Sequence, residues 1–469
     1  MSDPDLIDIK DVAPAEVSEL DLYQKREKIY TRKIEGFFQH LRLFTGWPLL
    51  LAYLLLPWLQ WGERQAVLFD LPARKFHIFG LVLWPQDFPL LAWLLVIAAF
   101  GLFAVTVFAG RIWCGYTCPQ TVWTSIFMWW EQRVEGSRNQ RIKVDKQAFS
   151  IQKISHKCLK HGGWLFFSLL TGMTFVGYFS PMKDLAWDLF SANSGKWQYL
   201  WTLFFTLATY INAGWLREQV CKYMCPYARF QSVMFDHNTL IVSYNPERGE
   251  PRGSRKHGAD YKTLGLGECI DCYLCVQVCP TGIDIRDGLQ YECIGCALCI
   301  DACNSVMDKL NYPKGLISYT SEAQLAGGST HWLRPRIVGY VLALAVMVAA
   351  FSAYVLMRVP LELTVIRDRN NLYVTNSQGE LVNLYTLSLV NMDTQGHTFT
   401  VKTSALEGAR LVGKNTYTLA GGEVRNLVMR VTADPDLLTI PSTPILFEVE
   451  AVDNPKLFTT SESRFMRPL

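Results

Sequence analysis

The chain has 469 residues, half of them hydrophobic and 13% aromatic, which is enough for about three folded units and excludes a disordered chain. Its net charge of +3, with only 19% charged residues, falls short of the concentrated basic surface that nucleic-acid binding requires. The 13 cysteines are too dilute for a disulfide scaffold, and they cluster in short runs, which favours metal ligation.

Five apolar stretches of about 20 residues are long enough to cross the hydrocarbon core of a membrane. They cover residues 41–59, 88–109, 164–179, 199–216 and 337–357. The N-terminal segment, residues 1–40, lacks the pattern of a secretory leader, so the first span is expected to remain as an anchor. We therefore predict a four-helix transmembrane region over residues 41–235 and a fifth transmembrane helix over residues 336–359.

The distribution of Lys and Arg predicts the orientation of these spans. Residues 110–160 carry nine basic residues, whereas residues 60–87 carry three and residues 181–196 carry two. The basic segment is therefore expected in the cytoplasm, together with the N-terminus and residues 217–336. Everything after the fifth span is then periplasmic, and the slight basic excess of the chain is attributed to topology.

Two short motifs of the form Cys-x-x-x-Cys-Pro each follow a predicted span. They contain Cys114 and Cys118 after the second span, and Cys221 and Cys225 after the fourth. Cysteines four apart lie on one face of a helix, and the proline can end that helix or begin another. Packing of two helix ends is the simpler explanation, but the exact repetition favours a functional site. Thiolates select Cu(I) and can donate electrons to Cu(II), so four thiols beside an electron supply suit copper reduction.

The strongest chemical signal lies in residues 236–335, where the spacing C-x2-C-x2-C-x3-C occurs twice. In two-cluster bacterial ferredoxins with this spacing, three cysteines of each copy hold one cluster and the fourth ligates the other cluster. This rule assigns Cys269, Cys272, Cys275 and Cys303 to a first [4Fe-4S] cluster, and Cys293, Cys296, Cys299 and Cys279 to a second. A zinc ribbon would need only paired C-x2-C knuckles and leaves the double register unexplained. Cys158, outside all these motifs, is assigned a structural role.

Residues 360–469 consist of short alternating runs separated by turn residues. The clearest cover residues 361–366, 384–390, 397–402, 424–431 and 445–452. About seven such strands in about 110 residues predict an immunoglobulin-like β-sandwich. This region has no cysteine and a single histidine, His397, so docking or stability is expected of it rather than catalysis. The predicted fold is thus an α-helical membrane protein with an inserted ferredoxin module and a C-terminal all-β sandwich.

Other redox cofactors have no signature in the sequence. Paired mid-span histidines, a C-x-x-C-H motif, a glycine-rich dinucleotide fingerprint and a P-loop are all missing from it. Haem and nucleotide cofactors are therefore not expected. The electron donor must be another protein or a diffusible reductant, which the sequence does not identify.

Three runs resemble the cytochrome c oxidase accessory protein family called FixG, RdxA or CcoG. They are residues 113–123 (WCGYTCPQTVW), 223–236 (YMCPYARFQSVMFD) and 248–253 (RGEPRG), and the resemblance extends over nearly the whole chain. It implies a cupric reductase of the bacterial inner membrane that supplies Cu(I) during assembly of the cbb-type oxidase. Carried over to this sequence, it implies two [4Fe-4S] clusters on the eight ferredoxin cysteines and copper at Cys114, Cys118, Cys221 and Cys225.

Two other functions stay open from the sequence. The chain could be an electron-transfer subunit between a membrane quinol and another redox enzyme, or a non-catalytic assembly scaffold whose clusters sense redox state. The expected partners are copper chaperones and oxidase assembly factors, implied by the resemblance, together with membrane lipid and an unknown electron donor. Nucleic acid is excluded, and a homodimer is allowed.

Overall fold

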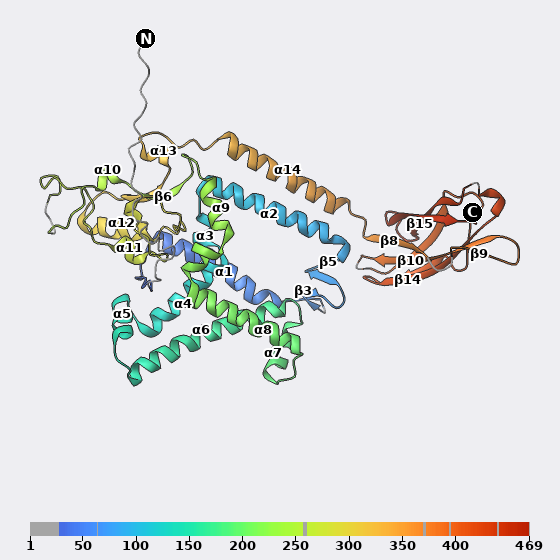
Figure 1. The fold of residues 1–469 in the computed structure, drawn as a ribbon, viewed down its shortest axis with the longest axis horizontal. Helices are drawn as coiled ribbons and strands as arrows, with labels where there is room; N and C mark the ends of the chain where they lie inside the picture. Colours follow the sequence, from blue (N-terminus) through green and yellow to red (C-terminus); the bar gives the residue numbers. More distant parts are fainter. Residues whose placement is uncertain are drawn as a thin grey trace, which may run out of the picture. The chain divides into compact units, whose positions relative to one another are not determined.

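The computed structural model describes residues 28–62, 64–256, 260–368, 372–393, 395–438 and 440–468. Of the expected cytoplasmic segment 1–40, residues 1–27 therefore lie outside the described residues. The chain divides into two compact units, one formed by residues 1–73 and 99–341 and the other by residues 74–98 and 342–469. Helices α2 (Phe88–Ala109) and α14 (Pro335–Met357) contribute residues to both units (Figure 1).

The first unit is mainly helical. Its larger helical segments are α1 (Phe37–Leu55), α3 (Ile112–Tyr116), α4 (Pro119–Glu135), α5 (Arg138–Lys146), α6 (Ile151–Gly177), α7 (Met182–Phe190), α8 (Lys196–Thr209) and α9 (Pro226–Met234), with π-helical turns η3 (Tyr210–Leu216) and η4 (Val220–Met224) between the last two. Helix α6 packs along both α4 and α8. Gly172 permits the close approach of α8, because an added Cβ would lie 2.7 Å from the carbonyl oxygen of Thr202.

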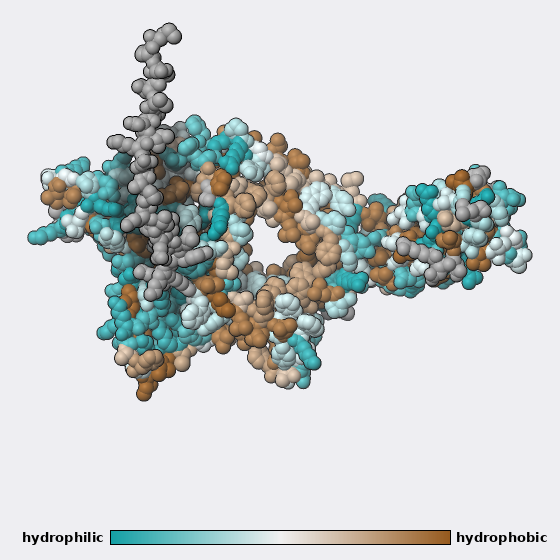
Figure 2. Space-filling view, viewed as in Figure 1, coloured by the Kyte–Doolittle hydropathy of each residue, from teal (hydrophilic) through white to brown (hydrophobic). Residues whose placement is uncertain are grey.

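In the part of the chain that the structure describes, three helical segments are long and apolar enough to cross a membrane. They are Phe37–Trp58, Pro85–Ala109 and Pro335–Met357, and they correspond to the first, second and fifth expected spans. The other two expected spans are helical but do not meet the same criterion. Helix α6 begins at Ile151 and carries Lys153, Lys157 and Lys160 in its first half, and α8 ends after 14 residues where the winding changes to π. Figure 2 shows apolar side chains gathered over the helices, whereas polar side chains predominate over the cysteine-rich module.

The cysteine-rich module is closed by a small antiparallel sheet. Strand β6 (Ile241–Tyr244) precedes the two cysteine motifs and pairs with β7 (Ile317–Thr320), which follows them. Between them lie α10 (Pro246–Gly249), α11 (Leu274–Val278) and α12 (Leu298–Leu310), and α13 (Glu322–Leu325) follows β7. The two ends of the module meet where the Arg334 guanidinium pairs with the Asp236 carboxylate.

The second unit contains a sandwich of two antiparallel sheets. One has the strand order β12-β14-β10-β8, with β9 also paired to β10, and the other has the order β13-β11-β15-β16. The strands are β8 (Leu361–Arg367), β9 (Val374–Thr375), β10 (Leu381–Asn391), β11 (His397–Ser404), β12 (Arg410–Val412), β13 (Thr416–Leu419), β14 (Val424–Ala433), β15 (Ser442–Ala451) and β16 (Phe458–Met466). The same unit holds the hairpin of β4 (Lys75–Ile78) and β5 (Leu81–Leu83).

The alternation expected from the sequence sets which side chains form the core of the sandwich. In β10, Leu381, Asn383, Tyr385 and Leu387 are buried, and the alternate residues between them are partly exposed. Leu387 lies opposite Leu427 of β14 and Val365 of β8. Four of the five expected runs fall within strands, and the fifth, residues 445–452, ends one residue beyond β15. The runs named from the sequence did not include the polar strand β16 or the short strands β9, β12 and β13. In the sheets, β16 pairs with β15, β9 with β10, β12 with β14 and β13 with β11.

Candidate functional site

The two cysteine motifs of the module fold in the same way. In the first, Asp271 and Tyr273 have φ values of 54° and 57°, and in the second Gly295 and Ala297 have φ values of 64° and 59°. These left-handed residues occupy equivalent positions beside the second cysteine of each motif, so the chain turns twice there before a helix begins. Backbone strain of this kind persists only where the surroundings determine it, as at a ligand site. The internal repeat of the sequence is therefore also a repeat of backbone conformation.

The eight cysteines of these motifs surround two cavities. One is lined by Cys269, Cys272, Cys275 and Cys303. The other is lined by Cys279, Cys293, Cys296 and Cys299, with Cys275 at its edge. The fourth cysteine of each copy thus lies with the first three of the other copy, which is the crossed arrangement expected of a two-cluster ferredoxin.

The protonation of these thiols fits a resident iron–sulfur group. Burial raises the pKa of Cys275, Cys293 and Cys303 to about 12, so the thiolate form needs a compensating positive charge. Iron would supply that charge, since a coordinating thiol is deprotonated by its metal. The two cavities would therefore hold the clusters, and when bound the clusters supply single electrons.

Replacing Cys279 by serine is expected to remove the cluster held by Cys293, Cys296 and Cys299 and to leave the other closer to intact. Crossed ligation is the reason, because Cys279 lies in the first copy but lines the second cavity. Iron analysis should show a loss of up to about half of the metal. Spectroscopy that instead showed preferential loss of the cluster at Cys269, Cys272 and Cys275 would contradict the assignment.

The two Cys-x-x-x-Cys-Pro motifs do not form single helices. Cys114 lies in the short helix α3, whereas Cys118 caps α4; Cys221 lies in η4, whereas Cys225 caps α9. The expectation that each pair shares one helical face is therefore wrong. The cause is the proline, which disfavours helical geometry in the residue before it and suits the first position of a new helix. Cys118 and Cys225 accordingly have ψ values of 128° and 110°.

The four thiols of these motifs are nevertheless brought together, although more than 100 residues separate the two pairs in the sequence. The pKa of Cys114 is raised to about 12, chiefly by burial and in part by the neighbouring Cys118 and Cys221. Burial also raises the pKa of Cys221 to about 11, again with contributions from Cys118 and Cys225. The side-chain amide of Gln120 joins the first motif to the chain that leads into the second, donating to the carbonyl oxygens of Asn212 (2.9 Å) and Arg217 (3.2 Å). We call these four thiols the thiol site.

Within the described residues no three His, Cys, Asp or Glu side chains are spaced to hold a single metal ion. The thiol site is therefore a group of neighbouring thiols that do not converge on one point in this structure. Metal binding would require loss of protons and rotation of side chains toward the ion. Cys158, by contrast, is exposed on α6 and lies outside both thiol groups.

The thiol site packs directly against the second cluster cavity. An added Cβ at Gly115 would lie 2.9 Å from the Cα of Cys296 and from the carbonyl oxygens of Ile294 and Gly295. Cys114 itself packs against the apolar group that contains Ile294, Cys296 and Leu298. The backbone of the first motif thus touches the backbone of the cluster loop. The sequence interpretation missed Gly115, although a glycine inside a helix is costly and usually has a packing reason.

A buried ion cluster holds the second motif in place. Glu131 of α4 is fully buried and forms ion pairs with Arg217 (2.9 Å), Arg141 (3.4 Å) and Lys160 (3.5 Å). Burial alone would raise the pKa of Glu131, but these three cations outweigh it and lower the pKa to about 2. Arg217 directly follows η3, so its pairing ties the chain before Cys221 to α4. The sequence interpretation attributed these basic residues to topology alone and missed this cluster.

Comparison with known protein families agrees with this organisation. A 4Fe-4S dicluster domain matches residues 216–322, and a second model, a 4Fe-4S binding domain, matches residues 91–137. A third model, the IG-like fold at the C-terminus of FixG, matches residues 351–468. The immunoglobulin-like character of the sandwich and the iron–sulfur character of the module are thereby confirmed.

Curated relatives match most of the chain. The nitrogen fixation protein FixG of Rhizobium meliloti is 38% identical over 89% of this chain and 86% of its own length. Protein RdxA of Cereibacter sphaeroides is 40% identical over 83% of this chain and 85% of its own length. The crystal structure of a FixG-related protein from Vibrio parahaemolyticus is 35% identical and covers 24% of this chain and 98% of that chain, with a TM-score of 0.22.

Proposed function

Because the chain belongs to the FixG and RdxA family of membrane iron–sulfur redox proteins, we propose that it reduces Cu(II) to Cu(I) at the thiol site. The observation that carries this proposal is the contact between the thiol site and the second cluster cavity, through Gly115 and Cys114. Soft thiolates favour Cu(I) over Cu(II), so a site built from them lowers the free energy of the reduced ion. Each Cu(II) takes up one electron, and that electron enters the protein at the clusters.

This proposal includes a role in assembly of the cbb-type oxidase. The reduced copper would pass to copper chaperones and oxidase assembly factors, and the sandwich would dock such partners at the periplasmic face. The protein would be a multi-pass protein of the bacterial inner membrane, with five transmembrane helices. Helix α6 and the continuous stretch of α8 and η3 would supply the third and fourth crossings.

A reporter fused after Lys146 or Lys262 is expected to behave as cytoplasmic, and one fused after Leu469 as periplasmic. The basic residues between the second and third spans fix this orientation. Paired phosphatase and fluorescent-protein fusions at the three positions measure it. Periplasmic activity at Lys146 would overturn the orientation, and with it the cytoplasmic location of the clusters.

One observation favours a second candidate for the thiol site. The 4Fe-4S binding domain that matches residues 91–137 contains only two cysteines of this chain, Cys114 and Cys118. Together with Cys221 and Cys225 they could ligate a third iron–sulfur cluster instead of copper. The iron content separates the two functions, because two clusters give about eight irons per chain and three give about twelve.

The proposed function is tested by mixing anaerobic, dithionite-reduced protein, freed of excess dithionite, with Cu(II). We expect Cu(I) to accumulate while the absorbance of the oxidised clusters returns, with one copper ion reduced for each electron released. A Cu(I)-specific chelator measures the product. Re-oxidation of the clusters without Cu(I), or no re-oxidation at all, would refute copper reduction.

A further inference from the structure

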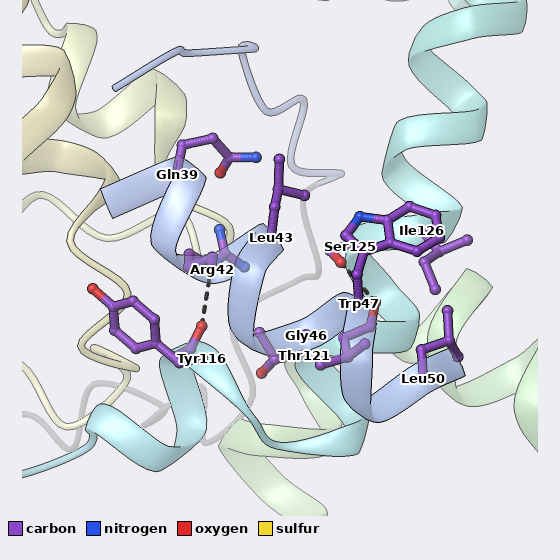
Figure 3. A pocket seen from close by; sticks show the side chains of 12 residues that line it. Gln39, Arg42, Leu43, Gly46, Trp47, Leu50, Tyr116, Thr121, Ser125 and Ile126 are labelled. Atoms are coloured by element: carbon purple, nitrogen blue, oxygen red, sulfur yellow. Dashed lines mark hydrogen bonds between the residues drawn. The ribbon is translucent and has the colours of Figure 1, made fainter. Parts of the chain in front are cut away.

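A groove runs along the first helix of the first unit, and neither the clusters nor the thiol site accounts for it. Two neighbouring cavities form this groove, and the larger has a volume of about 320 Å³, within the range of small-molecule sites. They are continuous because both are lined by Gln39, Arg42, Leu43, Trp47, Ser125 and Ile126. Figure 3 shows Trp47 of α1 beside Ser125 and Ile126 of α4, with Gln39 and Arg42 nearer the start of α1. We call it the α1–α4 groove.

The polarity of the groove changes along α1. Its lining residues on this helix are three or four positions apart and so form one face, which begins with Gln39 and Arg42 and continues through Gly46 to Leu50. Gly46 keeps the groove open, because an added Cβ would lie 3.3 Å from a methyl group of Val122. Since α1 is a candidate membrane span, the polar end lies at the membrane boundary and the apolar end lies within the hydrocarbon. This gradient fits a molecule with a polar head and an apolar tail.

The polar end of the groove adjoins the second cluster cavity. Its wall includes Val278 and Pro280, which flank Cys279, and Leu298, which precedes Cys299. A bound head group would therefore lie beside two of the expected ligands of the second cluster. This position suits a redox-active head group, which must lie close to a cluster to transfer electrons to it. A structural lipid can bind without a cluster beside it.

Both charged and uncharged polar side chains line this end of the groove. The Lys33 ammonium lies 2.8 Å from the Glu35 carboxylate, and Arg42 Nε donates to the carbonyl oxygen of Gly115 at 3.0 Å. The exposed Arg32 and His40 belong to the same lining. The walls offer the uncharged side chains of Gln39, Ser125 and Gln132. A carbonyl or hydroxyl head group suits them better than a phosphate does.

We propose that the α1–α4 groove binds a membrane hydroquinone and that this hydroquinone is the electron donor of the protein, an inference that rests on the proposed function. One hydroquinone gives up two electrons and two protons and becomes a quinone. Clusters held by the cysteines of the two cavities would each accept one of these electrons, and both protons would pass to cytoplasmic water at the mouth of the groove. One hydroquinone therefore supports the reduction of two Cu(II) ions.

The test uses the full-length, cluster-loaded protein in quinone-free lipid nanodiscs with decylubiquinone as the probe. Binding is measured by equilibrium partition of labelled quinone, and donation by anaerobic bleaching of the clusters with decylubiquinol. Ser125→Phe fills the groove and is expected to weaken binding at least tenfold and to slow bleaching in parallel. Leu49→Phe is the matched control, because Leu49 is half-exposed on α1 and does not line the groove; it should bind as the parent does.

A second variant keeps the test decisive if Ser125→Phe fails to retain iron. Gln39→Leu preserves the size of the side chain, and the hydrogen bond that residue 39 makes to Asp301 uses its backbone N–H, so the fold is retained. Loss of its amide should weaken quinone binding about threefold to tenfold. Reduction by dithionite verifies that the clusters are assembled in each variant.

Several results would overturn the inference. They are parental quinone binding in both groove variants, quinone binding without cluster bleaching, and displacement of quinone by an anionic phospholipid, which would identify the groove as a lipid site. The outcome is separable from that of the proposed function. With the thiol-site cysteines replaced by serine, decylubiquinol should still bind and bleach the clusters, even if no copper is ever reduced.

Discussion

Replacing Cys114, Cys118, Cys221 and Cys225 together by serine is expected to lower Cu(II) reduction to the rate measured without protein, while the iron content stays unchanged. A serine hydroxyl is a hard, weak ligand that neither holds Cu(I) nor donates an electron to Cu(II). None of the four residues lines either cluster cavity, so both clusters should assemble. The measurements are Cu(I) formation by the pre-reduced variant and iron per chain.

Cys158→Ser is the matched control, because it removes an exposed cysteine that lies outside both motifs. It should reduce copper at the parental rate. If the quadruple variant also did so, copper would be meeting the clusters directly, and the four thiols would be packing residues. A fall in iron of about four per chain would instead identify a third cluster at the thiol site.

Glu131→Gln is expected to destabilise the protein by up to about 3–5 kcal/mol, because it removes the carboxylate shared by Arg141, Lys160 and Arg217, of which Lys160 keeps its ion pair with Glu135. The parental pKa of about 2 also sets a pH dependence. Since folding lowers this pKa from 4.5, the contribution of Glu131 is complete above the unfolded value and is lost as the pH falls toward 2. Unfolding in detergent, followed by loss of helical circular dichroism at pH 7, measures the difference.

Glu35→Gln makes the corresponding control in an exposed ion pair. Lys33 and Glu35 are both about three-quarters exposed, so breaking their contact should leave the stability of the protein close to that of the parent. Equal stability of Glu131→Gln and the parent would show that the buried cluster does not stabilise the fold. The anchoring role assigned to Arg217 would then have no support.

Periodicity was sufficient to predict elements whose environment is uniform along their length. The span at residues 88–109 coincides with α2, and the alternating run at residues 384–390 lies within β10, because each pattern reflects one continuous environment. The expected span at residues 164–179 is only the second half of α6. The first half of α6 carries lysines that form ion pairs with Glu135 and are largely buried. A hydropathy scale scores these lysines as it would score lysines in a solvent-exposed turn, so it placed the start of the helix too late.

Spacing predicted the composition of the candidate site better than its geometry. Each cluster cavity collects the cysteines that the ferredoxin rule assigned to it, because that rule encodes a local chain path. The meeting of Cys114 with Cys221 is a long-range contact that no local spacing encodes. The same holds for Gly115 against Cys296 and for Glu131 with Arg217, which depend on how separate helices pack.

The change from α to π winding at Tyr210–Leu216 has a consequence for how the motifs can vary. A π-helical turn behaves as an insertion within an α-helix, and each residue of an α-helix turns the chain by about 100°. Such a turn absorbs its extra residue locally, whereas a residue added or removed without a matching change of winding would rotate everything that follows, including Cys221 and Cys225. A homologous sequence could thus retain both Cys-x-x-x-Cys-Pro motifs letter for letter and still direct its second pair away from the first. The number of residues between the motifs is therefore as much a part of the thiol site as the cysteines themselves.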